Sequence, residues 1–273
     1  MPTTVQAALL GVVQGFTEFL PVSSSAHLIL ARAFFGWDTD AFGLPFDVAC
    51  HAGTLIAVLV YFRRDIAEMV ASLSHLHRPG RDKGARLVWL LAVGTIPAIV
   101  VGLLFNRRIE AHLRTPQVAA VALALGAIGL LVAERAGSKN RGDEGLTIGD
   151  AFVLGCAQAA ALIPGVSRSG ATLTAALLLG LRRPEAARFI FLLAIPAILA
   201  AVGHEAPKLL QAGLGGEMAT LAAIGVVTSA IVGYVTVTCF IRYLARHSLD
   251  VFAWYRLALA ATVAIWLYAV ASA

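Results

Sequence analysis

The sequence predicts an all-α, polytopic membrane protein, and three observations support this prediction. Of its 273 residues, 59% are hydrophobic and only 14% are charged, whereas soluble domains carry about 25% charged residues. The mean hydropathy is +0.82. Several runs of apolar residues approach the length of about 20 residues that a helix needs to cross a bilayer. The composition therefore excludes an ordinary soluble domain.

Six segments are long and apolar enough to form transmembrane helices. Four are apolar almost throughout, and the other two carry one arginine each, Arg188 and Arg256. The predicted spans are 46–62, 87–105, 118–133, 186–202, 218–241 and 251–270. We expect these helices to form one integral membrane domain over residues 1–273.

Two other apolar stretches, 5–31 and 147–181, are interrupted by polar residues near their middle. Each has the pattern of a half-length helix, a break rich in Pro and Ser, and a second half-length helix. Non-helical backbone at membrane depth is tolerated only where protein or a water-filled cavity surrounds it. We therefore expect two re-entrant helix pairs in addition to the six spans.

The two interrupted stretches share a pattern in which Gly-x-x-Gln precedes Pro-x-x-Ser. It occurs as Gly11-x-x-Gln14 with Pro21-x-x-Ser24, and again as Gly155-x-x-Gln158 with Pro164-x-x-Ser167. Matching broken helices in two halves of a chain indicate internal repeats with a site at the bilayer midplane. The predicted halves are roughly 1–135 and 147–273. Chance similarity between helices rich in small residues is the alternative.

The basic residues predict the orientation of the chain. If each pair returns to its side of entry and the six spans alternate, 14 basic residues lie on one face and 5 on the other. The positive-inside rule assigns the first face to the cytoplasm, and the two halves then have inverted topology. This placement also accounts for the net charge of +5 without nucleic acid as a partner.

The first break concentrates chemically active side chains within an apolar stretch. An ionisable residue in a membrane segment is a functional hypothesis by default, and Glu18 and His27 are two such residues. Gln14 shares a helical face with Glu18, because the two stand four residues apart. The hydroxyls of Ser23, Ser24 and Ser25 lie between the carboxylate and the imidazole.

The second break has the composition of an anion site. Glycines allow backbone to approach a ligand closely, hydroxyls donate hydrogen bonds, and a following half-helix directs its N-terminal N–H groups at the same place. Arg168 adds a fork of donors that matches phosphate oxygens. The candidate binding residues besides Arg168 are Gly165, Ser167, Ser169, Gly170 and Thr172.

Together the two breaks predict phosphoryl transfer, which needs positioning, charge stabilisation and an aligned nucleophile. Arg168 is the predicted clamp. Glu18 is a candidate for holding a divalent cation or for acting as a base, and either Ser24 or His27 could attack phosphorus while the other moves the proton. A buried ion network that only holds the hairpins together is the structural alternative.

Three other polar residues in apolar segments each have two possible roles. Asp47 and His51 share one face of the segment 46–62, and they either line the rim of the site or pack in the core. Arg256 either anchors the last span by snorkelling to the interface or reaches the phosphate cavity as a substrate-binding residue.

The two motifs, Gln14-Gly-Phe-Thr-Glu-Phe-Leu-Pro-Val-Ser-Ser-Ser-Ala-His27 and Pro164-Gly-Val-Ser-Arg-Ser-Gly-Ala-Thr172, resemble those of the undecaprenyl-diphosphate phosphatase family. These are integral membrane enzymes linked to bacitracin resistance, and the resemblance covers essentially the whole chain. It implies six spans, two re-entrant pairs, inverted repeats and location in the bacterial inner membrane.

The resemblance also implies hydrolysis of the lipid carrier diphosphate to the monophosphate, which recycles the carrier for cell-wall synthesis. Mg²⁺ or Ca²⁺ would assist the reaction, in a cavity open to the periplasm. The family's functional residues fall on Glu18, Ser24, His27, Arg168 and Arg256, and its phosphate-contacting positions on Ser167 and Thr172. A homodimer is left open.

One departure from the family pattern bears on the metal site. Gln14 stands where many members have the first Glu of an E-x-x-x-E pair, so Glu18 is the only carboxylate predicted to bind the cation.

Two alternative functions remain. A lipid-carrier transporter or flippase would use the same inverted-repeat cavity without a nucleophile. The type 2 phosphatidic-acid phosphatases share fragments of these motifs, but their further histidine is missing, since no His follows Arg168 until His204.

Overall fold

The computed structural model describes residues 3–37, 42–77, 82–211 and 216–272, and of residues 110, 205–211 and 217 it describes only the backbone. Helices make up most of these ranges, and the described residues contain no β-strand beyond one isolated bridge between Arg141 and Leu181. The predicted all-α class is confirmed.

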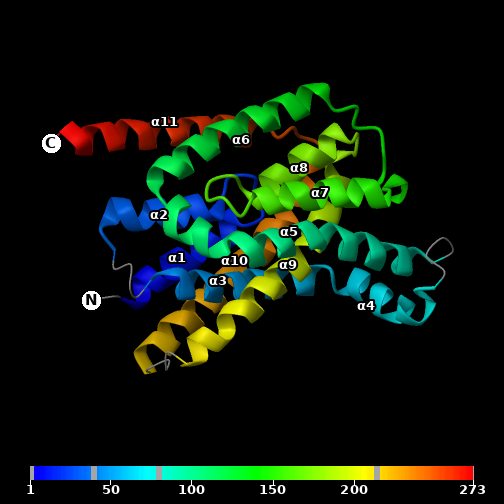
Figure 1. Ribbon diagram of the computed structural model, residues 1–273, viewed down its shortest axis with the longest axis horizontal. Coiled ribbons are helices and arrows are strands. Elements are labelled where there is room, and N and C mark those ends of the chain that lie inside the picture. The colour runs from blue at the N-terminus through cyan, green and yellow to red at the C-terminus, as the bar shows by residue number, and fades with distance from the viewer. Residues whose placement is uncertain (1–2, 38–41, 78–81, 212–215, 273) are drawn as a thin grey trace.

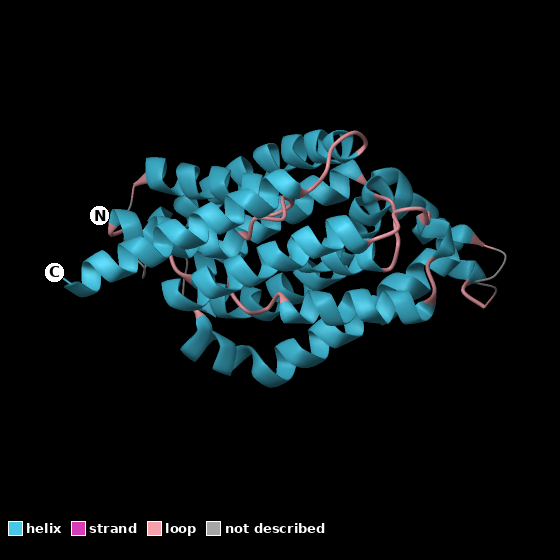
Figure 2. Cartoon of the chain, turned by 90° about the horizontal axis from the view of Figure 1, so that it is seen from above, coloured by secondary structure: helices cyan, strands magenta, loops and turns pink. Residues whose placement is uncertain are grey.

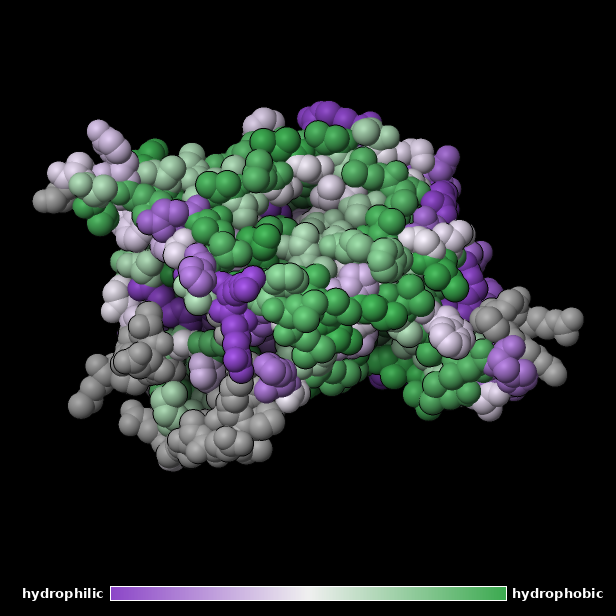
Figure 3. Space-filling view, in the orientation of Figure 1, coloured by the Kyte–Doolittle hydropathy of each residue, from purple (hydrophilic) through white to green (hydrophobic). Residues whose placement is uncertain are grey.

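Six long helices form most of the described chain, some of them along the longest axis of the molecule and others oblique to it (Figure 1). They are α3 (Leu44–Tyr61), α5 (Lys83–Leu113), α6 (Pro116–Ala136), α9 (Arg183–Gln211), α10 (Gly216–Leu244) and α11 (Asp250–Ser272). Among the described residues, these six contain windows long and apolar enough to cross a membrane. They match the six predicted spans, and apolar side chains cover most of the face shown in Figure 3.

The two interrupted stretches fold into four short helices. The first pair is α1 (Thr4–Thr17) with α2 (Ser24–Phe35), and the second is α7 (Ile148–Ala160) with α8 (Arg168–Leu178). The predicted breaks therefore fall at residues 18–23 and 161–167. Thr3 and Thr147 are the N-cap residues of α1 and α7, and each forms a capping box. The two pairs therefore begin with the same capping motif.

Small residues allow each first half-helix to lie close along a long helix. A Cβ atom on Gly11 would lie 2.9 Å from the carbonyl oxygen of Gly225 in α10, and one on Gly155 would lie 2.3 Å from that of Gly94 in α5. Such distances leave no room for a side chain. One face of α1 therefore packs against α10 and one face of α7 against α5, while the opposite faces carry exposed apolar side chains such as Phe16 and Phe152. The described chain is a layered assembly of helices joined by short loops (Figure 2).

The remaining short elements, α4 (Arg63–Ala71), η1 (Ser72–His75) and η2 (Asp143–Gly145), lie near one end of the bundle. Arg188 of α9 binds Asp65 and Asp143 there, which explains its position in an apolar segment. Nearby, the Ala85 N–H holds the pKa of the Asp82 carboxyl below its usual range, because it donates to this helix cap. Arg78 and Arg81, which also support the predicted orientation, lie outside the described residues.

Candidate active site

A cavity of about 700 Å³ lies where the two breaks approach α3, α5 and α9. Apolar residues such as Ile99, Leu103 and Ile198 form much of its wall. Its polar lining comprises Glu18, Ser23, Ser24, Ser25, His51, Asn106, Arg107, Gln158, Ser167, Arg168 and His204. The cavity thus combines a polar site from both breaks with hydrocarbon-like walls.

Glu18 is the centre of the polar site. Its side chain is 3% exposed, and its Oε2 accepts hydrogen bonds from Ser24 Oγ at 2.6 Å and from Gln14 Nε2 at 2.7 Å. Arg168 Nη2 from the second break contacts Oε1 of the same carboxylate. The structure therefore brings Glu18, Ser24 and Arg168 together, although 150 residues separate the two charged partners.

His51, for which the sequence left the rim of the site and the core as alternatives, lies at the site. Its Nε2 lies 3.5 Å from Glu18 Oε2, and its Nδ1 lies 2.7 Å from the carbonyl oxygen of Asp47. This carbonyl can only accept, so Nδ1 carries a proton and Nε2 faces the carboxylate with its lone pair when the ring is neutral. The Asp47 carboxylate binds Arg32 at 2.8 Å and Arg114 at 2.5 Å. Of the two predicted alternatives, His51 lines the cavity and Asp47 is part of the buried framework.

His27 points to a different neighbour. Its Nδ1 lies 2.7 Å from the Ser23 carbonyl oxygen, and its Nε2 lies 2.7 Å from the hydroxyl of Tyr255. The two rings are stacked with centroids 5.7 Å apart, and His27 is absent from the described lining of the cavity. The imidazole thus holds the first break against α11, and of the two candidate nucleophiles only Ser24 lies at Glu18.

The two breaks end in the same unusual backbone conformation. Ser23 has a φ of 72° and Ser167 a φ of 71°, and each immediately precedes a half-helix. A non-glycine residue adopts this region only where the surrounding structure imposes it. The pattern in the sequence pairs Ser24 with Ser167, an offset of 143 residues. The strained serines and the helix starts Ser24 and Arg168 are instead offset by 144 residues.

Arg256 joins the two breaks from α11. Its side chain is fully buried, and its donors bind the carbonyl oxygens of Pro21 in the first break at 3.2 Å and of Gly165 in the second at 3.1 Å. The same guanidinium binds the carbonyls of Leu123, Ala122 and Val166. The snorkelling alternative is wrong because the side chain points into the protein. Its donors bind backbone and the residue does not line the described cavity, so a direct contact with substrate stays a prediction.

Four more predicted binding residues lie behind the cavity surface. The hydroxyl of Ser169 donates to the Leu20 carbonyl at 2.8 Å, and that of Thr172 donates to the Arg168 carbonyl at 2.7 Å. Gly165 has a φ of +96°, which favours glycine. A Cβ on Gly170 would lie 2.5 Å from Arg256 Nη1. These residues shape the break, while Ser167 reaches the cavity itself.

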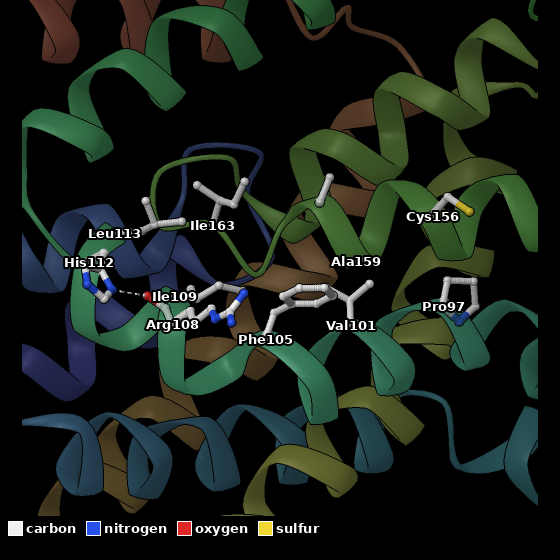
Figure 4. A pocket seen from close by; sticks show the side chains of 11 residues that line it. Pro97, Val101, Phe105, Arg108, Ile109, His112, Leu113, Cys156, Ala159 and Ile163 are labelled. Carbon is white, nitrogen blue, oxygen red and sulfur yellow. Dashed lines mark hydrogen bonds between the residues drawn. The ribbon is translucent and has the colours of Figure 1, made fainter.

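A second hollow, of about 720 Å³, lies between α5 and α7 (Figure 4). Its lining is almost wholly apolar, with Arg108 and His112 near one end and Cys156 near the other. None of the predicted site residues lines it. The chemistry of the breaks is therefore confined to the first cavity.

Comparison with known proteins agrees with this geometry. The family model described as "Bacitracin resistance protein BacA" matches residues 7–262. The chain belongs to this family. It is 49% identical to a protein of Rubrobacter xylanophilus over 95% of this chain and 97% of that protein, and 46% identical to one of Moorella thermoacetica over 96% and 97%. Both relatives carry the name undecaprenyl-diphosphatase. With its six apolar helices, the chain is a multi-pass membrane protein.

Replacing Arg256 by Met tests its role between the breaks. We expect the midpoint of thermal unfolding in detergent to fall by at least about 5 °C, because each buried carbonyl left without a donor costs about 1–3 kcal/mol. Arg135→Met is the matched control, since Arg135 makes a 3.5 Å ion pair with Asp250 at 64% side-chain exposure and such pairs contribute little. Equal unfolding midpoints for the two variants would contradict the proposed role of Arg256 between the breaks.

Proposed function

We propose that the chain hydrolyses undecaprenyl diphosphate to undecaprenyl phosphate and inorganic phosphate. The observation that carries this proposal is the contact of Ser24 and Arg168 with the one carboxylate of Glu18. A nucleophile, a base and a cation matched to phosphate thus lie side by side. The names of the relatives support the same substrate, and the apolar wall of the cavity suits a polyprenyl chain.

The positions of the three groups support a particular order of events. Ser24 Oγ donates to Glu18 at 2.6 Å, so the carboxylate can take its proton as the oxygen attacks the terminal phosphorus. Arg168, with its side chain 21% exposed, stabilises charge on the phosphate oxygens. The bond to the bridging oxygen breaks, its electron pair leaves with the lipid monophosphate, and water then releases phosphate from Ser24.

Helix N-termini add to this stabilisation. Ser24 and Arg168 are the first residues of α2 and α8, so both helices begin at the cavity. Backbone N–H groups at a helix start favour an anion in front of them. A diphosphate placed at Ser24 therefore lies near the positive ends of two helix dipoles.

His51 is the proposed second proton carrier. Its Nε2 faces the carboxylate at 3.5 Å, a separation that can shorten in a substrate complex. Because Gln14 cannot ionise, His51 takes the place that a second carboxylate would have beside Glu18. We propose that Glu18 passes the proton of Ser24 to His51, which returns it when the phosphoserine is hydrolysed.

We also propose that both short helix pairs are re-entrant and that the halves are inverted repeats. The matched capping residues Thr3 and Thr147 and the matched serines, Ser23 and Ser167, support a repeat with an offset of 144 residues. The bias of basic residues supports a cytoplasmic position for the end that carries α4. The cavity would then open toward the periplasm of a bacterial inner membrane.

The described residues suit a cation that arrives with the substrate. They include no cluster of three His, Cys, Asp or Glu residues that could hold a metal ion, and Glu18 is the one carboxylate in the described lining of the cavity. Mg²⁺ is often held by one or two carboxylates together with substrate phosphates. We propose Glu18 as the protein ligand; when bound, Mg²⁺ or Ca²⁺ would neutralise part of the diphosphate charge.

Substituting Arg168 or Ser24 tests whether the protein hydrolyses its substrate, because a transporter would need neither a nucleophile nor phosphate release. We expect Arg168→Ala and Ser24→Ala to lower kcat at least about 10³-fold, a loss typical of an arginine that stabilises a phosphoryl transition state. The measurement is phosphate release from a polyprenyl diphosphate by purified protein in detergent. Arg108→Ala is the control, because Arg108 lines the second hollow between α5 and α7 and not the cavity at Glu18. If the unmodified protein releases no phosphate, the transporter becomes the better interpretation.

Exchanging each histidine for glutamine tests the assignment of the proton carrier. An amide keeps a hydrogen bond but cannot accept a proton, so we expect His51→Gln to move the acid limb of the pH profile of kcat to lower pH. That limb would then report Glu18 alone. His27→Gln should lower activity without moving the limb, because His27 supports the Ser23 loop. A shift in His27→Gln and none in His51→Gln would reverse the assignment.

A second carboxylate beside Glu18 should increase the affinity of the site for a divalent cation. In Gln14→Glu, the donor at 2.7 Å from Glu18 becomes a like charge, which a divalent cation can compensate. We expect activity to persist and to saturate at a lower Mg²⁺ concentration than in the unmodified protein. The check is a Mg²⁺ titration of chelator-treated protein, and an inactive variant at all Mg²⁺ concentrations would contradict the proposed geometry.

A further inference from the structure

Gln158 lies in the last turn of α7 and lines the cavity. It is only 3% exposed, yet neither its Oε1 nor its Nε2 has a hydrogen-bond partner among the described residues. Of the buried side chains that lack partners in this part of the chain, Gln158 alone has two such atoms. A buried amide without partners destabilises a fold, whereas an apolar side chain of similar shape would not.

The counterpart of Gln158 in the first half shows what the amide lacks. With the repeat offset of 144 residues, Gln158 corresponds to Gln14, whose Nε2 donates to Glu18 at 2.7 Å. The residue that corresponds to Glu18 is Leu162, which also lines the cavity but cannot accept a hydrogen bond. The two halves thus share the amide and differ in its partner.

Gln158 therefore lines the cavity with an amide whose donor and acceptor are bonded by none of the described residues. An apolar chain passing Ile99 and Leu103 could not pair with either atom, so the ligand must bring polar groups to this depth. Arg168 and Ser167, which line the same cavity, are donors to anions. The chemistry around the amide therefore favours a phosphate group with its hydration water.

We infer that Gln158 is a substrate-binding residue for the diphosphate headgroup. Its Nε2 donates to a non-bridging phosphate oxygen, and its Oε1 accepts from a water molecule or from a protonated phosphate oxygen. The neutral amide adds a hydrogen bond without adding charge to a site that already contains Arg168. This inference rests on the proposed function, and it assigns Gln158 to binding and not to the chemical step.

The test is Gln158→Leu, which keeps the approximate shape and removes both polar atoms. We expect KM for a polyprenyl diphosphate to rise about ten- to a hundredfold, as for the loss of one hydrogen bond to a charged group, with kcat little changed. The midpoint of thermal unfolding without substrate should stay the same or rise. The control is Cys156→Ser, which changes a residue of the same helix that lines the second hollow. This variant should keep the kcat and KM of the unmodified protein.

A merely structural glutamine would behave in the opposite way. The Leu variant would then unfold at a lower temperature and keep its KM, and this result would overturn the inference. An unchanged KM with unchanged stability would overturn it as well.

A binding measurement without turnover separates this inference from the proposed function. Inorganic pyrophosphate should raise the unfolding midpoint of the unmodified protein, and Gln158→Leu should need about tenfold more pyrophosphate for the same shift. If the unmodified protein releases no phosphate but shows this difference, hydrolysis is the wrong function and Gln158 still binds a diphosphate. Equal pyrophosphate requirements for the two proteins would overturn the assignment of Gln158.

Discussion

The arrangement of the site depends on the guanidinium of Arg256, which binds backbone carbonyls of both breaks and of α6. Helix breaks inside a membrane expose carbonyl groups that neither lipid nor a regular helix can satisfy. Arg256 supplies donors to Pro21 in one break and to Gly165 in the other, and Gly126 leaves the space that it occupies. A charge that would be costly in lipid is stabilised here by the very groups that the breaks leave unpaired. Arg256 therefore holds the two breaks together, beside the Ser169–Leu20 hydrogen bond and the Arg168–Glu18 contact.

With the breaks held in place, positions 144 residues apart carry different chemistry. Ser24 and Arg168 each begin a half-helix after a strained serine, yet one carries a hydroxyl and the other a guanidinium. Glu18 has no acidic counterpart, because Leu162 occupies its place. In the mechanism that we propose, the first break therefore contributes the reacting groups and the second contributes charge stabilisation. Two identical breaks would have placed either two carboxylates or two arginines at one anion.

Much of the fold and part of the site could be predicted from residues that lie close together in the sequence. Pro21 and Pro164 mark the breaks, and Glu18 and Arg168 stand out because charge is rare in apolar segments. His51 could not be assigned, since only the packing of α3 against the first break brings it to Glu18. The partners of Arg256 are backbone carbonyls, which leave no trace in the sequence. The sequence could not show which serines are strained, because the spacing from proline to the strained serine differs by one residue between the breaks.

The buried polar residues of this protein differ in how fully they are bonded, and this difference carries functional information. Ser169, Thr172 and Arg256 bind backbone carbonyls within the fold, so their hydrogen bonds already contribute to the stability of the breaks. The side-chain amide of Gln158, in contrast, makes no hydrogen bond with the described residues. Composition marks both kinds of residue alike as polar groups in an apolar segment. An unpaired buried amide costs stability unless a ligand or water satisfies it, and the incomplete hydrogen bonding at the cavity is therefore better evidence for binding than residue type alone.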